Sequence, residues 1–227
     1  MRATAGHLLG GRLRYAQPAD GYRTGIEPVL LAASVPARPG QRVLEGGTGA
    51  GAGLMCLAAR VPGIAGVGIE LDPEMAALAR RNIADNALPG LQVITGDVLE
   101  LPVGGFDHAF ANPPWHDPGS TPSPLQRRRL AKQGAGLEAW IAALARALRP
   151  GGTLALILPA HQADRAEAAW RRTGLDGPGV VALRPKAGRA AKLALLCSGG
   201  SREIVLHERD GAYTAEIEAV LRAGAAL

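Results

Sequence analysis

Short apolar runs alternate with amphipathic segments from about residue 42 to the end of the chain. Runs of Val, Ile, Leu and Phe that stop at glycine, proline or an acidic residue indicate buried strands, and apolar residues three and four positions apart indicate helices between them. We predict strands at 43–45, 64–69, 91–95, 106–111, 153–158, 180–183, 193–197 and 203–207. We predict helices at 28–34, 54–60, 73–86, 137–148, 164–172 and 214–222, with Asp72 as the N-cap of the third.

The first forty residues follow a different pattern. Residues 7–17 alternate around Gly10-Gly11, which predicts a β-hairpin, and Pro28 opens a short helix. The βα alternation that follows predicts an α/β fold, a Rossmann-like, doubly wound, mostly parallel seven-stranded sheet. It carries a C-terminal antiparallel hairpin and a short N-terminal β-hairpin extension. We expect a single domain over 1–227, with the N-terminal hairpin and helix in 1–40 and the catalytic core in 41–227.

Composition favours a cytoplasmic globular protein. The chain is 47% hydrophobic and 20% charged, and no apolar run reaches the length of a membrane span. Its two cysteines do not have the spacing of metal ligands, so neither a membrane nor a metal is expected as a partner.

Charge is segregated along the chain. Residues 43–110 hold three Arg against eight Asp or Glu, a net charge of −5, whereas the whole chain carries +5. The basic excess therefore lies elsewhere, in three groups: Arg12, Arg14 and Arg23; Arg127, Arg128, Arg129 and Lys132; and Arg184, Lys186, Arg189 and Lys192. An acidic core with basic outer segments favours a polyanionic partner such as nucleic acid, although charge runs are also common on plain solvated faces.

A glycine-rich turn follows the first strand of the core. Gly47, Gly49 and Gly51 satisfy a dinucleotide-binding fingerprint, and Glu70 comes about twenty residues later, at the end of the next strand. With Glu45 the same glycines also give an acidic-x-G-x-G-x-G turn. In both patterns glycine lets the backbone approach a nucleoside, so the turn alone leaves a nicotinamide and an adenosyl cofactor open.

The fourth strand of the core ends at Asn112-Pro113-Pro114-Trp115. Two prolines stop the strand and remove two backbone donors, which leaves the Asn112 side chain and the Pro113 carbonyl oxygen as free acceptors beside an aromatic face. Such a pair suits a planar group with an exocyclic amine. Because parallel strands present their carboxyl ends at one rim, these acceptors and the glycine-rich turn are expected to converge.

Together these motifs resemble class I S-adenosylmethionine-dependent methyltransferases. In that family a carboxylate after the third strand, here Asp97, accepts from the cofactor adenine, and the Asn/Asp-Pro-Pro-aromatic motif marks enzymes that methylate amino groups. The resemblance implies S-adenosyl-L-methionine as cofactor and Asn112, Pro113 and Trp115 as catalytic residues. It implies cofactor binding by Arg23, Gly25, Glu45, Gly47, Gly49, Gly51, Glu70, Asp97 and Asn112.

The segment 13–32 narrows the resemblance to bacterial tRNA adenine-N6 methyltransferases, which modify the adenosine beside the anticodon of a valine tRNA. By that resemblance Arg23, Gly25 and Glu27 would lie over the cofactor and substrate pocket. Ile26 and Trp115 depart from that pattern, where a hydroxyl residue and a Tyr or Phe are more usual. The resemblance implies tRNA as partner, and the long segment 116–136 is expected to be a functional loop. The residues expected at the RNA are Tyr22, Arg127, Arg128, Arg129 and Lys132. Methylation of glutamine N5 in a protein and a non-catalytic nucleoside- or RNA-binding module remain as alternatives.

Overall fold

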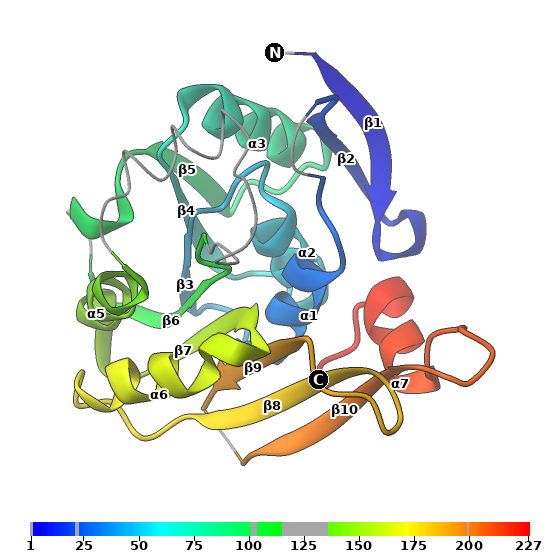
Figure 1. Ribbon diagram of the computed structural model, residues 1–227. Coiled ribbons are helices and arrows are strands. Elements are labelled where there is room, and N and C mark those ends of the chain that lie inside the picture. The colour runs from blue at the N-terminus through cyan, green and yellow to red at the C-terminus, as the bar shows by residue number, and fades with distance from the viewer. Residues whose placement is uncertain (1, 21–22, 101–103, 115–135, 199) are drawn as a thin grey trace.

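The computed structural model describes residues 2–20, 23–100, 104–114, 136–198 and 200–227 (Figure 1). Its strands are β1 (Ala3–Leu8), β2 (Leu13–Pro18), β3 (Arg42–Gly46), β4 (Ala65–Glu70), β5 (Leu91–Thr95), β6 (Phe106–Ala111), β7 (Leu148–Pro159), β8 (Gly179–Lys186), β9 (Leu193–Cys197) and β10 (Arg202–His207). Its helices are α1 (Glu27–Ser34), α2 (Ala52–Arg60), α3 (Pro73–Asp85), α5 (Leu137–Ala147), α6 (Ala163–Arg171) and α7 (Ala215–Glu218), and α7 continues as a π-turn over Ala219–Ala223.

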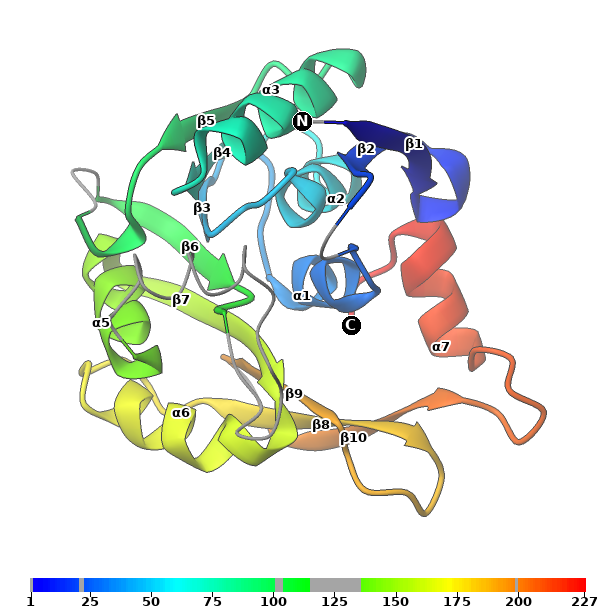
Figure 2. The same cartoon turned by 45° about the horizontal axis from the view of Figure 1, so that its top comes forward.

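The central sheet has the strand order β10-β8-β9-β7-β6-β3-β4-β5. All its pairings are parallel except those of β9, which runs antiparallel to both β7 and β8, as the arrows of Figure 2 show. The doubly wound, mostly parallel arrangement and the antiparallel β8–β9 hairpin are confirmed. The count of seven strands is wrong: within the described residues the sheet has eight, because β10 adds to β8 in parallel.

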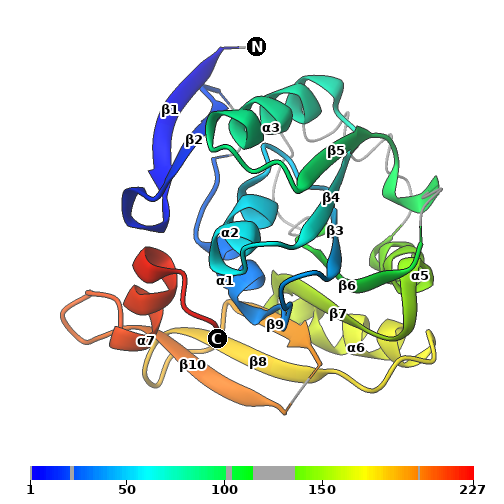
Figure 3. The ribbon, with the colours of Figure 1, turned by 180° about the vertical axis from the view of Figure 1, so that it is seen from behind.

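Helices cover both faces of the sheet. Buried residues of α1, α2 and α3 form one apolar cluster, and those of α5 and α6 form the other (Figures 1 and 3). Trp140 of α5 and Trp170 of α6 are buried in the second cluster and pack its core. Asp72 caps α3, since its Oδ1 accepts from the backbone N–H of Glu74 (2.9 Å) and Met75 (3.3 Å).

The N-terminal hairpin of β1 and β2 stands apart from the sheet and packs against α3 and the C-terminal segment (Figure 3). Arg12, in its turn, donates from Nη1 to the Ala223 carbonyl oxygen (2.5 Å). The predicted hairpin is confirmed, and its strands reach further out than residues 7–17. Among the described residues no helix is both long and apolar enough to span a membrane.

Candidate active site

The strand order reverses between β3 and β6, and the candidate site lies at this point. β4 and β5 continue on one side of β3, whereas β6 and β7 lie on the other. Gly46 of β3 pairs with Ala111 of β6, so Gly47 and Asn112 leave the sheet side by side. Loops diverge at such a reversal and leave a crevice at the carboxyl ends of the strands, where α/β sheets bind ligands. The predicted convergence of the two motifs is confirmed.

The turn after β3 depends on glycine. Gly47, Gly49 and Gly51 have φ values of +66°, +58° and +90°, a region that L side chains rarely adopt. At Gly47 a Cβ would also lie 2.9 Å from Cη2 of the buried Trp140. Any other residue would strain the turn at these positions, and glycine leaves its backbone without side chains of its own there.

Glu45 lies beneath the turn and is 5% exposed. Its Oε2 accepts from the Leu54 backbone N–H at 2.9 Å and from the Thr48 hydroxyl. Burial raises the pKa of Glu45 to about 8, and the charge of Glu70 adds to the rise, while the two hydrogen bonds oppose it. Glu45 thus holds the start of α2 to the turn from the inside.

Two more carboxylates lie along the rim. Glu70, at the end of β4, accepts from Gly49 N–H at Oε2 (2.8 Å) and from Asp72 N–H at Oε1 (2.9 Å). Asp97 follows β5 and accepts from Leu99 N–H at Oδ1 (2.9 Å). A carboxylate oxygen has two lone pairs, so both groups can still accept a hydroxyl or an amine. The hydrogen bond to Leu99 N–H makes Asp97 part of the local turn, and its other oxygen can still accept from a ligand.

The acceptor pair after β6 remains available. The Asn112 side chain is half-buried and Pro113 is buried. Within the described residues, no hydrogen bond occupies the Asn112 side chain or the Pro113 carbonyl oxygen. β6 itself is almost wholly buried, which fixes the position from which both groups project.

α1 and α2 run in the same direction, and both begin at the rim. Arg60, the last residue of α2, donates from Nη2 to the carbonyl oxygens of Ala32 (2.9 Å) and Val35 at the end of α1. Glu27, the first residue of α1, is therefore at the rim end of that helix. Its Oε2 is buried and has no hydrogen-bond partner in the described part of the chain. An unpaired buried carboxylate oxygen is expected to meet a donor or a cation on a bound molecule.

The other predicted site residues divide into two groups. Arg23 and Gly25 are exposed on the segment that leads into α1. A side chain at Gly25 would come against the Glu27 carboxylate and would displace it. The remaining predictions lie outside the described residues: Tyr22, Trp115, Arg127, Arg128, Arg129, Lys132 and most of the loop 116–136.

Sequence reasoning missed Asn82, an asparagine of α3 that joins the N-terminal hairpin to the glycine turn. It is 1% exposed. Its amide exchanges two hydrogen bonds with Ala16 of β2 (2.9 and 2.8 Å), and its Nδ2 also donates to the Ala50 carbonyl oxygen (2.9 Å). Asn86, one turn later, exchanges the same pair with Arg14. The i, i+4 spacing of two asparagines was the available signal, because it puts both amides on one helix face.

The hairpin in turn holds the segment before α1. The Tyr15 hydroxyl lies 2.7 Å from Thr24 Oγ1, and Thr24 N–H donates to Gln17 Oε1 at 3.0 Å. Asn82 therefore lies in a continuous chain of hydrogen bonds from the glycine turn through β2 to the residues that precede Glu27. Within the described ranges, no cluster of three or more His, Cys, Asp or Glu could hold a metal ion.

Comparisons with known proteins agree with this geometry. Residues 26–168 match the family model described as "Methyltransferase small domain". Proteins named tRNA1(Val) (adenine(37)-N6)-methyltransferase from Aeromonas salmonicida and Aeromonas hydrophila are 30% and 31% identical, with 85% of each chain covered. The structure of a predicted O-methyltransferase from Agrobacterium tumefaciens superposes with a TM-score of 0.70 at 26% identity, over 88% of this chain and 98% of that one.

The rim suits S-adenosylmethionine, the cofactor of this enzyme. The glycine turn has no side chain at three of its positions and is exposed at Gly47, and Glu70 and Asp97 keep acceptor capacity. Glu27 presents a buried oxygen that has no partner among the described residues. These features match a ligand with hydroxyls, an adenine amine and positive charge. Because the matched family model spans more than half of it, the chain belongs to the methyltransferase small domain family.

Proposed function

We propose that this enzyme transfers the methyl group of S-adenosylmethionine to the N6 amine of an adenine in tRNA. The observation that carries the proposal is the adjacency of Gly47 and Asn112, which follow paired residues of β3 and β6. This adjacency brings Asn112 and Pro113 next to the glycine turn, which is proposed to approach the cofactor. The relatives named as tRNA1(Val) adenine-N6 methyltransferases support the acceptor.

Each rim residue receives a role in this proposal. Gly47, Gly49 and Gly51 let the backbone lie against the nucleoside, with Glu45 supporting the turn from below. Glu70 accepts from the ribose hydroxyls and Asp97 from the adenine amine. Arg23, Gly25 and Glu27 close the site from the side of α1, with the Glu27 carboxylate near the positively charged part of the cofactor.

The chain's part in the reaction is to position and polarise an amine. S-adenosylmethionine supplies a methyl group that is already electrophilic, so alignment of the attacking nitrogen is the main requirement. The amine lone pair of adenine is delocalised into the ring. Hydrogen bonds from its two N–H groups to Asn112 Oδ1 and the Pro113 carbonyl oxygen favour a pyramidal nitrogen and stabilise the positive charge that develops on it. Trp115 is proposed to stack on the adenine.

An adenine in an anticodon loop suits such a site. Bases of single-stranded loops are unstacked more easily than bases of a duplex, so extruding one into the crevice costs less. Arg127, Arg128, Arg129 and Lys132 are proposed to contact the RNA backbone, with Tyr22 beside the target base. The proposal requires the enzyme to work where tRNA is present, in the cytoplasm.

Incubation with radiolabelled S-adenosylmethionine and total tRNA tests the proposal. We expect label in RNA, released on digestion as N6-methyladenosine. Label in a glutamine side chain of an added protein extract would favour the alternative acceptor, for which the Asn112–Pro113 pair is equally suited. Cofactor binding without transfer to either would indicate a non-catalytic binding module and would overturn the proposal.

Replacing Asn82 with alanine should weaken cofactor binding through the glycine turn. The substitution removes the hydrogen bond to Ala50 and both bonds to Ala16. We expect the Kd for S-adenosylmethionine to rise about tenfold, which corresponds to the free energy of one hydrogen bond. Isothermal titration calorimetry measures it. Asn86→Ala is the matched control, because it releases the hairpin at Arg14 but does not touch the turn. Equal Kd values for the two variants would show that Asn82 acts on the hairpin alone.

A further inference from the structure

The turn between β8 and β9 is basic and exposed. Lys186, Arg189 and Lys192 project from it, and no acidic residue occurs from position 185 to 193. We call these three residues the basic turn. In the described part of the chain none of them forms an ion pair. A charge run of this kind is often only a solvated face, so its position has to decide whether it serves binding.

The basic turn lies on the same rim as the candidate active site. β9 is antiparallel to β7 and β8, so the turn that precedes it is at the carboxyl end of the parallel strands. The Ala160 N–H, just after β7, donates to the Lys192 carbonyl oxygen at 2.9 Å. β7 adjoins β6, and a strand spacing of about 4.8 Å puts Lys192 about 10 Å to the side of the β6 end.

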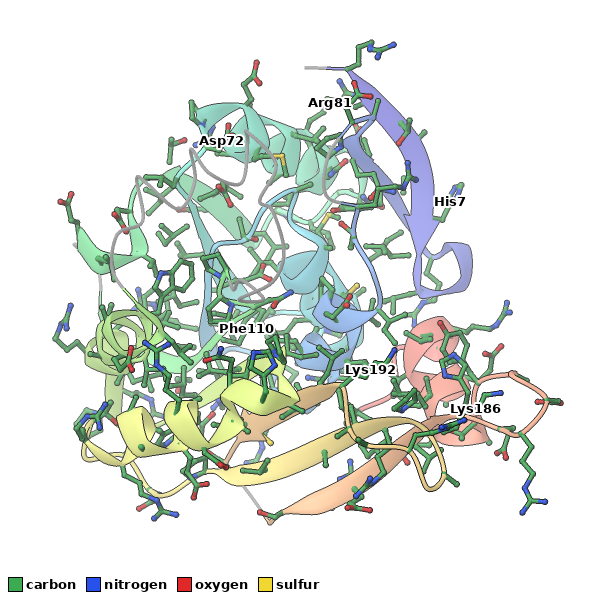
Figure 4. All side chains as sticks on the ribbon, viewed as in Figure 1. His7, Asp72, Arg81, Phe110, Lys186 and Lys192 are labelled. Atoms are coloured by element: carbon green, nitrogen blue, oxygen red, sulfur yellow. The ribbon has the colours of Figure 1, made fainter. Side chains whose placement is uncertain are left out.

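The turn also reaches beyond the level of Asn112. Leu156 of β7 pairs with Ala111, and β7 continues for three residues to Pro159. Pro159 pairs with Leu193, Leu193 pairs with Leu183, and β8 continues from there to Lys186. Figure 4 shows Lys192 nearer to Phe110 of β6 and Lys186 further out along the sheet. The basic turn therefore forms a raised, positively charged flank beside the crevice.

Contacts within the protein hold the turn in shape. Arg184 pairs with Glu203 and donates from Nη1 to the Arg189 carbonyl oxygen (2.7 Å). His207 Nδ1 lies 3.1 Å from the Pro185 carbonyl oxygen, and the His207 ring stacks on Tyr213 with centroids 4.6 Å apart. Lys186 Nζ donates to the Arg209 carbonyl oxygen at 3.2 Å, a contact that leaves its charge without an acidic partner among the described residues. Arg184 thus holds the turn in shape, whereas the charges of Lys186, Arg189 and Lys192 can meet a polyanion.

The neighbouring turn after β10 does not neutralise the positive charge of the basic turn. It carries Glu208, Arg209 and Asp210, all exposed, for a net charge of −1. That turn belongs to the outermost strand of the sheet, whereas Lys192 is next to β7. Lys192 therefore lies nearer to the crevice than the acids of this turn do.

We propose that the basic turn binds backbone phosphates of the RNA beside the nucleotide that enters the crevice. The inference rests on the proposed function for its RNA partner and adds a docking surface made of other residues than those of the segment 116–136. Phosphates are the ligands that unpaired Lys and Arg on a rim bind most readily, and each such contact releases counterions.

Charge reversal tests the inference. The test variant carries Lys186→Glu, Arg189→Glu and Lys192→Glu. The control variant carries Arg38→Glu, Arg146→Glu and Arg172→Glu, which change three exposed arginines near the amino ends of the parallel strands. We expect the first variant to raise the Kd for tRNA at least tenfold at 0.1 M salt. The slope of log Kd against log salt should fall by about two to three, one for each lost phosphate contact. The Kd for S-adenosylmethionine should not change in either variant.

Neutral replacements serve as a second test, in case reversal of the three charges disturbs the folding of the turn. Lys186→Gln, Arg189→Gln, Lys192→Gln should lower the salt slope to the same extent, with a smaller change in Kd. If wild-type enzyme methylates tRNA but the basic-turn variants bind tRNA with the same Kd and salt slope as the control variant, the proposed docking surface is wrong and the proposed function stands. If wild-type enzyme neither binds nor methylates tRNA, the proposed function fails and the docking surface fails with it.

Discussion

Replacing Asn112 with alanine should lower kcat for methyl transfer by about two to three orders of magnitude, the loss measured when one preorganised hydrogen-bonding group is removed from a transition state. The expected result follows from the Asn112 side chain, which has no hydrogen-bond partner among the described residues and lies at the end of an almost wholly buried strand. Its acceptor meets a charge that develops only as the nitrogen attacks. Steady-state kinetics at saturating S-adenosylmethionine and tRNA measures the change in kcat.

The accompanying binding measurement separates chemistry from folding. The Kd of Asn112→Ala for S-adenosylmethionine should stay within about threefold of wild type, since the side chain acts mainly on the amine. Asn112→Asp is the matched control, because it keeps an acceptor oxygen at the same place and should retain much more activity than the alanine variant. Full turnover by Asn112→Ala would remove the basis of the proposed mechanism.

Replacing Glu45 with glutamine should make the protein more stable at alkaline pH. Burial raises the pKa of Glu45 to about 8 in the folded protein, against an ordinary value near 4.5. Between these values the folded chain holds a proton that the unfolded chain has released, so stability falls as pH rises from 4.5 to 8. One pKa unit corresponds to 1.4 kcal/mol, so wild type should lose about 3 kcal/mol relative to Glu45→Gln between pH 5 and 8.

The comparison between variants is needed because another buried group titrates with the opposite sign. Burial lowers the pKa of His108, so the unfolded chain takes up a proton first as the pH falls, and this group costs stability below its ordinary pKa. Urea denaturation at pH 5, 6, 7 and 8 gives the free energy of unfolding for wild type, Glu45→Gln and a control, Glu208→Gln, at an exposed site. Parallel pH curves for wild type and Glu45→Gln would contradict the prediction.

Most of the rim could be predicted from sequence because short stretches of neighbouring residues specify its turns and strand ends. Glycines at 47, 49 and 51 have φ values that only glycine adopts with ease, and consecutive prolines after Asn112 stop a strand whatever surrounds it. The order of these motifs on successive strands then fixes their meeting at one rim, since parallel strands share a carboxyl edge.

The contacts between distant segments could not be predicted. The eighth strand depends on β10 adding to β8 in parallel, which no pattern within residues 202–207 specifies. Asn82 reads as an ordinary polar residue of an amphipathic helix, and only the packing of β2 against α3 turns its amide into a bridge to the glycine turn.

The sequence by itself determined the α/β alternation, the glycine turn and the acceptor pair at Asn112 and Pro113, because each is encoded in a few neighbouring residues. The cofactor class followed from the family that these motifs together resemble. Only the tertiary structure decided the burial that leaves Glu27 Oε2 without a partner among the described residues and raises the pKa of Glu45, and the position of the basic turn beside the crevice. The physical reason is that burial, pairing and proximity are properties of segments far apart in the chain, and no local pattern of residues records them.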